Sequence, residues 1–148
     1  MDKKQRNILF LCTGNSARSI MAEAILKHKG GDLFRAFSAG SHPCGSVNPL
    51  SLETLEQAGI SSFGAKSKSW DVFAKKGAPV MDMVITVCDN AAGETCPLWP
   101  GSPKRDHWPF KDPAAQSGSE KEKQAAFRKV FHQIEKKINA FLEENENA

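Results

Sequence analysis

A cysteine and an arginine stand six positions apart in the segment Cys12-Thr-Gly-Asn-Ser-Ala-Arg18, joined by small residues and followed by Ser19. An apolar, strand-like run over 7–12 precedes the loop, and helical spacing begins at Ser19. A tight loop between a strand and a helix can point several backbone N–H groups at one centre, to which the helix N-terminus adds partial positive charge. The segment therefore predicts a site for a tetrahedral oxyanion, formed by Thr13, Gly14, Asn15, Ser16, Ala17 and Arg18.

The expected nucleophile of this site is the Cys12 thiol. The positive field of the loop, together with Arg18 and the Ser19 hydroxyl, is expected to lower the pKa of Cys12 and keep it as a thiolate. The planar guanidinium of Arg18 can bind two oxygens of one anion. In the alternative interpretation, Cys12 is a small buried residue at a strand end and Arg18 a solvated charge, but the strand, loop and helix together favour the oxyanion site.

Two further cysteines, Cys88 and Cys96, bracket a segment of mostly short side chains that can form about two turns of helix. If that segment is helical, the two Cα atoms lie roughly 12 Å apart, whereas a disulfide tolerates at most about 7 Å. A bond between them therefore requires local unwinding, which Gly93 makes easier because glycine weakens a helix. The alternative is a buried strand-end Cys88 and a loop thiol at Cys96 without a function. Cys44 has no assigned role.

A displacement at a tetrahedral oxyanion also needs a proton donor for the leaving oxygen. Asp112, in Lys-Asp-Pro, is one carboxylate that could serve, but from the residues alone an aspartate before proline favours a plain turn. Asp106 is the competing carboxylate, and we rank it second because it falls inside an expected edge strand.

The elements that must position these residues alternate between strand and helix. Apolar runs predict strands over 7–12, 33–39 and 83–88, helical spacing predicts helices over 19–29 and 49–58, and an edge strand over 105–108 and an amphipathic helix over 120–142 follow. This alternation predicts a single α/β domain with a parallel sheet covered on both faces. Its ligand site belongs at the carboxyl ends of the strands, where Cys12 and Cys88 fall.

Composition excludes several classes of partner. The 148 residues carry 20 Lys+Arg against 17 Asp+Glu, a net charge of +3, with acidic residues mixed in throughout, so no basic face for nucleic acid is expected. No apolar run approaches the roughly 20 residues of a membrane span, and the first residues do not resemble a signal peptide. We expect a monomeric cytoplasmic protein that binds neither nucleic acid nor membrane, with cysteines that are free, catalytic or redox-active.

Several further blocks accompany the loop. In chain order they are Ser38-Ala-Gly-Ser, Ser67-Lys-Ser-Trp-Asp71, Val87-Cys-Asp-Asn-Ala-Ala-Gly-Glu-Thr-Cys-Pro97 and His107-Trp-Pro-Phe-Lys-Asp-Pro113. With these blocks the chain resembles the low-molecular-weight protein tyrosine phosphatase superfamily, and as a whole its arsenate reductase branch. The resemblance implies a four-stranded parallel sheet in the order 2-1-3-4, flanked by helices, and Asp112 as the general acid. The aromatic residues that follow this acid in the tyrosine phosphatases are absent here, so a small oxyanion, arsenate or phosphate, fits better.

The resemblance also implies a sequence of thiol reactions. Cys12 attacks arsenate, Cys88 attacks the adduct and releases arsenite with a Cys12–Cys88 disulfide, and Cys96 then moves the disulfide to Cys88–Cys96. Thioredoxin, or glutathione with glutaredoxin, would reset the enzyme. Two differences bear on this choice: Cys88 and Cys96 are one residue further apart than in the thioredoxin-coupled reductases, and Ala17 replaces a second loop cysteine.

No organic cofactor is expected. In the arsenate reductase branch a monovalent cation such as potassium is held near the loop, and the residues similar to its ligands are Asn15, Glu23, Ser38 and Asp71. Local hydrogen bonds, turn caps and a solvated glutamate would explain these residues equally well.

Two other functions stay open at this stage. One is a tyrosine phosphatase or phosphomonoesterase in which water hydrolyses the Cys12 adduct. The other is a phosphocysteine carrier or an oxyanion-binding regulator, which would have no use for a general acid at Asp112.

Overall fold

A four-stranded parallel sheet forms the centre of the protein in the computed structural model, which describes residues 5–88 and 103–146. The strands are β1 (Arg6–Leu11), β2 (Phe34–Ala39), β3 (Met83–Thr86) and β4 (Lys104–His107). Their order is β2-β1-β3-β4, and every pair is parallel. The predicted sheet order and strand direction are therefore confirmed.

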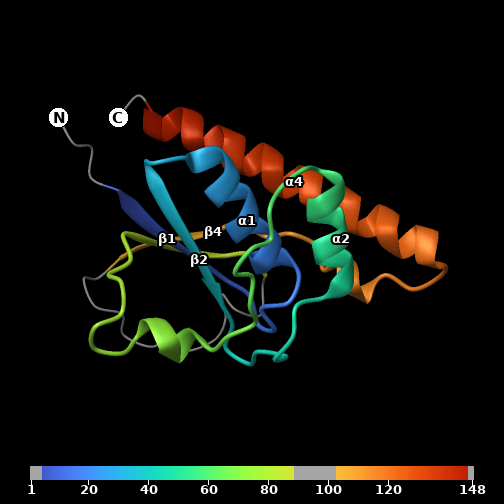
Figure 1. The fold of residues 1–148 in the computed structure, drawn as a ribbon, viewed down its shortest axis with the longest axis horizontal. Helices are drawn as coiled ribbons and strands as arrows, with labels where there is room; N and C mark the ends of the chain where they lie inside the picture. Colours follow the sequence, from blue (N-terminus) through green and yellow to red (C-terminus); the bar gives the residue numbers. More distant parts are fainter. Residues whose placement is uncertain (1–4, 89–102, 147–148) are drawn as a thin grey trace.

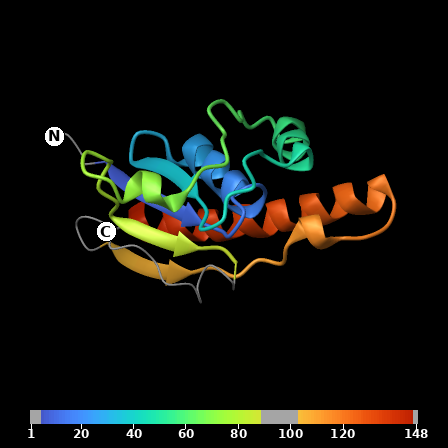
Figure 2. The ribbon, with the colours of Figure 1, turned by 90° about the horizontal axis from the view of Figure 1, so that it is seen from below.

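Three α-helices of the described residues cover one face of this sheet (Figures 1 and 2). They are α1 (Arg18–Gly30), α2 (Pro49–Gln57) and α4 (Glu120–Glu146). A short 3-10 helix packs against the other face, so both faces are covered as predicted. Two short 3-10 helices were not expected from the sequence, η1 (Trp70–Phe73) and η2 (Pro113–Ala115). Each begins at a polar residue whose side chain accepts a hydrogen bond from the backbone two positions on, Ser69 for η1 and Asp112 for η2.

Strand β1 is apolar from Ile8 to Leu11 because this part of it is buried on both faces. Ile8 and Phe10 pack into the core between the sheet and the helices, whereas Leu9 and Leu11 pack into a smaller cluster with Phe73 of η1. All four β1 side chains are buried, which is the reason for a continuous apolar run rather than an alternating one. This position in the middle of the sheet fixes the place of the loop that begins at Cys12.

The last helix is longer than its apolar pattern predicts. The pattern indicates 120–142, but α4 continues to Glu146. The guanidinium of Arg6 on β1 donates to Asn145 Oδ1 at 2.7 Å, and Asn145 Nδ2 donates to the Phe141 carbonyl at 2.7 Å. A contact with residues far away in sequence therefore stabilises the final turn, and local periodicity carries no signal for it.

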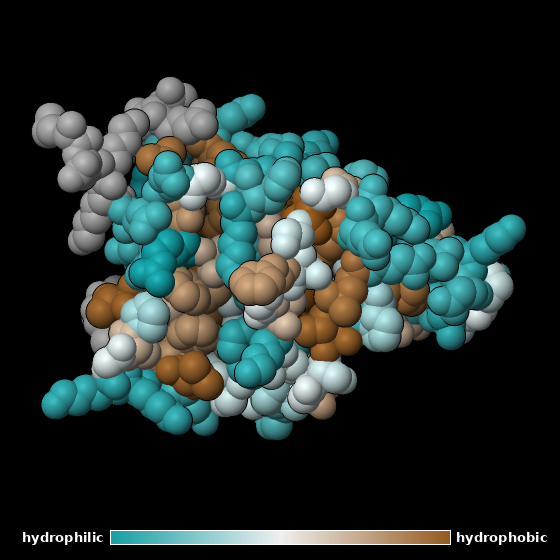
Figure 3. All heavy atoms as spheres, in the orientation of Figure 1, coloured by the Kyte–Doolittle hydropathy of each residue, from teal (hydrophilic) through white to brown (hydrophobic). Residues whose placement is uncertain are grey.

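Hydrophilic side chains spread over the face shown in Figure 3, and the hydrophobic ones appear in several separate groups. Within 5–88 and 103–146, no helix combines the length and apolar character needed to cross a bilayer.

Candidate active site

The loop from Cys12 to Ala17 connects β1 to α1, and its carbonyl groups are held from outside the loop. The Thr13, Gly14 and Ser16 carbonyls accept backbone hydrogen bonds of 2.9–3.0 Å from His42, Cys44 and Asn48. In a planar trans peptide the N–H of the following residue points away from the carbonyl. Fixing these carbonyls outward therefore turns the next N–H groups toward the other side of the loop, as an oxyanion site requires.

Asn15 gives the loop its sharp turn. Its φ of 46° lies in the left-handed region, where asparagine is tolerated better than most residues. The fully buried side chain donates from Nδ2 to Ser19 Oγ at 2.8 Å and accepts at Oδ1 from the Lys68 backbone N–H at 2.9 Å. Both ends of the amide are thus used to hold the strained turn against α1 and the segment before η1.

Arg18, the first residue of α1, lies beside Asp112. Its Nη1 donates to the Phe110 carbonyl at 2.9 Å, and its Nη2 is 3.7 Å from Asp112 Oδ2. Its Nε is buried and has no hydrogen-bond partner within the described part of the chain. A buried donor without an acceptor is unfavourable, and an oxyanion in the loop would supply one.

Asp112 has the contacts of a turn residue and also faces the arginine of the loop. Its Oδ1 caps η2 by accepting from the Ala114 N–H at 2.9 Å, while Oδ2 faces Arg18. The side chain is 43% exposed, so it can exchange protons with water. Both carboxylate oxygens of the competing Asp106 instead accept local hydrogen bonds, from the His107 N–H at 2.8 Å and from the Trp108 indole N–H at 2.9 Å.

Cys88 comes to the same place as Cys12, because the carboxyl ends of the adjacent strands β1 and β3 meet there. Both thiols are buried, and Cys88 lies close enough to Cys12 to act on its ionisation. The Cys88 sulfur also accepts from the Thr13 N–H at 3.4 Å and lies 3.7 Å from the Thr13 hydroxyl. The fold therefore brings a second thiol, 76 positions further along the chain than Cys12, to the loop of the expected nucleophile.

The nearby Cys88 thiol changes the ionisation of Cys12. The hydrogen bond to Cys88 and then burial raise the pKa of Cys12 far above its ordinary value, while the charge of Arg18 lowers it. The expectation of a lowered pKa is therefore wrong for this arrangement. The loop and Arg18 do favour a thiolate, but a second thiol in contact with Cys12 competes for the negative charge.

Of the two remaining cysteines, only Cys44 lies in the described part of the chain. Cys96, together with the segment expected to unwind on oxidation, lies outside the described residues. Cys44 is exposed and packs against the outside of the loop, where its Sγ would lie 3.0 Å from a Cβ at Gly14. The contact with the loop was not expected, because no local pattern connects 42–48 to the residues after β1.

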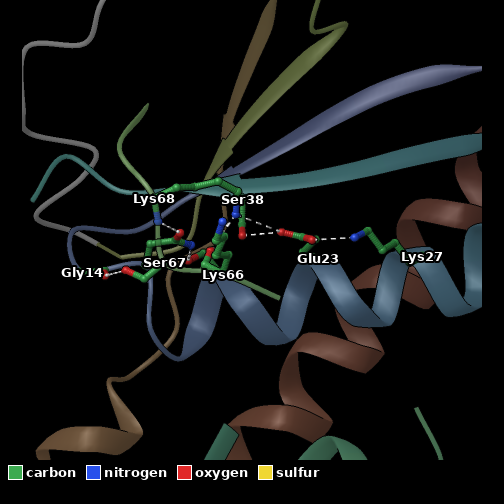
Figure 4. A network of polar contacts seen from close by, with 9 residues as sticks. Gly14, Glu23, Lys27, Ser38, Lys66, Ser67 and Lys68 are labelled. Atoms are coloured by element: carbon green, nitrogen blue, oxygen red, sulfur yellow. Dashed lines mark hydrogen bonds and ion pairs between the residues drawn. The ribbon is translucent and has the colours of Figure 1, made fainter. Parts of the chain in front are cut away.

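The four residues expected at a monovalent cation site are not equivalent in the structure. Asn15 and Ser38 are fully buried, Glu23 is 6% exposed, and Asp71 on η1 is exposed. Figure 4 shows Glu23 between two lysines, with Lys27 Nζ 2.7 Å and Lys68 Nζ 3.9 Å from its carboxylate oxygens. The Ser38 hydroxyl donates to the same carboxylate at 2.5 Å.

Lys68 is the residue of this site that the sequence did not single out. Burial lowers the pKa of Lys68, and the neighbouring Glu23 carboxylate opposes that effect. Its Nζ also donates to the Lys66 carbonyl at 2.7 Å (Figure 4). The Glu23 carboxylate therefore already has two ammonium groups and a hydroxyl as partners within the described part of the chain.

Comparisons with known proteins agree with this geometry. An arsenate reductase of Bacillus licheniformis is 39% identical over 142 residues, covering 96% of this chain and 99% of the relative. A solved arsenate reductase in the phosphate binding state superposes with a TM-score of 0.76 at 26% identity, over 95% of this chain and 98% of that one. The thioredoxin-dependent arsenate reductase of Corynebacterium glutamicum superposes with a TM-score of 0.64 at 25% identity, over 95% of this chain and 63% of that one.

Residues 7–147 match the family described as low molecular weight phosphotyrosine protein phosphatase. The match includes the loop, both buried thiols and Asp112, and the sheet order agrees with the fold expected for that superfamily. The chain therefore belongs to the low molecular weight phosphotyrosine protein phosphatase family, and it is similar over nearly its full length to family members that are arsenate reductases.

Proposed function

We propose that this protein reduces arsenate to arsenite, with Cys12 as the nucleophile and Cys88 as the second thiol. The observation that supports this choice most directly is the position of Cys88, whose buried sulfur accepts a hydrogen bond from the N–H of Thr13, the residue next to Cys12. A phosphatase of this family needs one thiol for its covalent intermediate, whereas reduction of arsenic(V) to arsenic(III) needs two thiols to supply two electrons. The arsenate reductases to which the chain is similar support the same assignment.

In the first step, the Cys12 thiol passes its proton to an oxygen of the bound arsenate, and the sulfur then attacks arsenic. A sulfur–arsenic bond forms while an arsenic–oxygen bond breaks. Arg18 binds the equatorial oxygens, and Asp112 donates a proton to the leaving oxygen, which departs as water. In the second step, the Cys88 thiolate attacks the Cys12 sulfur. The sulfur–arsenic electron pair stays on arsenic, so arsenite leaves and a Cys12–Cys88 disulfide remains.

The net reaction converts hydrogen arsenate (HAsO4²⁻), two protons and two thiols into arsenous acid, one disulfide and water. Transfer of the disulfide to Cys96 and reduction by thioredoxin, or by glutathione with glutaredoxin, complete the proposed cycle. The thioredoxin-dependent relative supports the first of these reductants. The proposed cycle starts from reduced cysteines and ends with a thiol reductant. Because such thiols stay reduced in the cytoplasm, we propose that the protein acts there.

A single-turnover experiment tests this proposal. Fully reduced protein receives excess arsenate without an external reductant, and free thiols, arsenite and the position of any disulfide are then measured. We expect the four thiols of the chain to fall to two, with one arsenite released per protein. Cys88→Ser should release no arsenite, whereas Cys44→Ser, a change at an exposed thiol outside the loop, should behave like the wild type.

The phosphatase alternative shares the first step and gives a different result. If four thiols persist in the wild type and p-nitrophenyl phosphate is hydrolysed at the same rate by Cys88→Ser, then hydrolysis is the activity of this loop. If thiols persist until glutathione is added, and arsenite then appears, an external thiol rather than Cys88 attacks the adduct, and the proposed role of Cys88 is wrong.

A further inference from the structure

A buried carboxylate lies next to the oxyanion loop and has two lysine partners. Glu23 of α1 is 6% exposed, and its oxygens are 2.7 Å from Lys27 Nζ and 3.9 Å from Lys68 Nζ (Figure 4). An ionised carboxylate with so little contact with water is unfavourable unless a positive charge lies beside it. The network therefore contains its own counter-charges.

The two lysines are not equivalent counter-charges. Lys27 lies one helical turn from Glu23 on α1, and its side chain is 47% exposed, so water screens its charge. The Lys68 side chain is 23% exposed, comes from the segment before η1, and is held by a 2.7 Å hydrogen bond to the Lys66 carbonyl. Lys68 is thus the partner with a fixed position and weaker screening.

Lys68 also connects this carboxylate to the loop through its backbone. Its N–H donates to Asn15 Oδ1 at 2.9 Å, and its carbonyl accepts from the Gly40 N–H at 2.9 Å. Asn15 in turn donates to Ser19 Oγ at 2.8 Å. One residue therefore joins the strained turn of the loop, the residue after β2 and the buried carboxylate on the helix that follows the loop.

We propose that the Lys68 ammonium takes, beside Glu23, the place that a monovalent cation would fill, and that Lys68 is a positioning residue for the oxyanion loop. Asp71 is exposed, and the Asn15 and Ser38 side chains are already engaged, so these residues do not form an open cage for potassium. The protein then needs no potassium. The inference concerns the support of the loop and does not depend on arsenate being its substrate.

The test compares potassium chloride with N-methylglucamine chloride at equal ionic strength, using wild type, Lys68→Met and Lys66→Met. Lys66 is the matched control, because its side chain is exposed and removing it deletes the same charge two positions away. The readouts are the thermal unfolding midpoint without phosphate and the dissociation constant for inorganic phosphate. We expect wild type and Lys66→Met to give the same midpoint in both salts.

For Lys68→Met we expect phosphate binding about three- to tenfold weaker than in the control when only N-methylglucamine is present. Potassium should restore part of this affinity and raise the midpoint of this variant alone, since the site beside Glu23 is then free to accept a small cation. Lys68→Arg, which keeps the charge, should bind phosphate like the wild type in both salts.

Three results would overturn the inference. The first is a potassium-dependent rise in the wild-type midpoint, which shows that a cation binds with Lys68 in place. The second is a Lys68→Met variant equal to Lys66→Met in both readouts, and the third is a loss of phosphate affinity that potassium does not restore. If Lys68→Met does not fold, the wild type and Lys68→Arg decide the question. The inference requires that the unfolding midpoint and the phosphate affinity of both proteins are the same in the two salts. A wild type that binds no phosphate contradicts the proposed function instead, and the thermal midpoints still decide the role of Lys68.

Discussion

At the scale of single residues, the site depends on the contact between Cys12 and Cys88. Each thiol is buried, and their closeness makes the ionisation of one depend on the other. Arg18 favours a thiolate at Cys12, whereas Cys88 and burial oppose it. The reactivity of the nucleophile is therefore a property of the pair, and removing one thiol should change the other.

We expect Cys88→Ala to lower the pKa of Cys12, because the contact with Cys88 is the largest cause that raises it. Below that pKa, each unit of decrease raises the thiolate fraction about tenfold, so alkylation of Cys12 should become faster at neutral pH. The measurement is the pH dependence of iodoacetamide modification at Cys12, followed by mass spectrometry in a Cys44→Ser background. A pH profile that stays in place or moves to higher pH would show that Cys88 does not suppress the thiolate.

At the scale of elements, the site forms where parallel strands end together. Strands β1 and β3 are neighbours in the sheet, which brings Cys12 and Cys88 to one edge. Strand β3 ends at Thr86, two residues before the predicted limit, although the Val87 N–H still donates to the Leu11 carbonyl at 2.9 Å. The regular hydrogen-bond pattern of β3 therefore ends two residues early, although the chain continues beside β1 for at least one more residue.

Strand β2 supports the loop through Gly40, the residue after its end. A Cβ at this position would lie 2.4 Å from the Thr13 carbonyl oxygen and 2.7 Å from that of Cys12. Both are backbone atoms of the loop, so they cannot move away without changing its shape. We therefore expect Gly40→Ala to weaken phosphate binding by about tenfold or more, measured by isothermal titration calorimetry.

Gly59→Ala is the control for this prediction. Gly59 has φ of 72° and open space around a Cβ, so alanine there should lower stability by about 1 kcal/mol through backbone strain. It should leave the phosphate dissociation constant unchanged, because Gly59 follows α2 at a distance in sequence from the loop. Equal phosphate affinity in Gly40→Ala and wild type would show that the loop tolerates the added methyl group.

At the scale of the whole molecule, the helical layer holds the sheet and thereby the loop. Helix α4 crosses the face that carries α1 (Figure 1), and an aromatic series connects the layers. The ring of Trp108 lies 5.9 Å from that of Phe10 and 5.6 Å from that of Phe141. Strand β1, the residue after β4 and the last helix therefore share one packed core.

This packing gives a stability prediction. Phe131 on α4 is 2% exposed and packs in the main core, so Phe131→Ala should lower the free energy of unfolding by about 3–5 kcal/mol. Phe63 is 94% exposed, and Phe63→Ala should change the free energy of unfolding by less than about 0.5 kcal/mol. Urea unfolding followed by circular dichroism measures both. A similar loss for the two variants would contradict the assignment of α4 to the core.

The sequence alone predicted the four strands and the three α-helices of the described residues, and it singled out the loop from Cys12 to Arg18. The apolar run before Cys12 predicts a central strand because burial on both faces leaves no polar position, and the small residues up to Arg18 predict the oxyanion loop. These signals are local, since a strand, a tight loop and a helix start each depend on residues a few positions apart. The sheet order came instead from the resemblance to a known family, and the structure agrees with it.

Only the tertiary structure decided which distant residues complete the site. Nothing near Lys68 in sequence indicates that its N–H holds Asn15 or that its ammonium lies beside Glu23. The raised pKa of Cys12 likewise depends on a thiol that reaches it across the sheet. Such effects depend on burial and on distances between atoms, and these quantities exist only after the strands and helices have packed together.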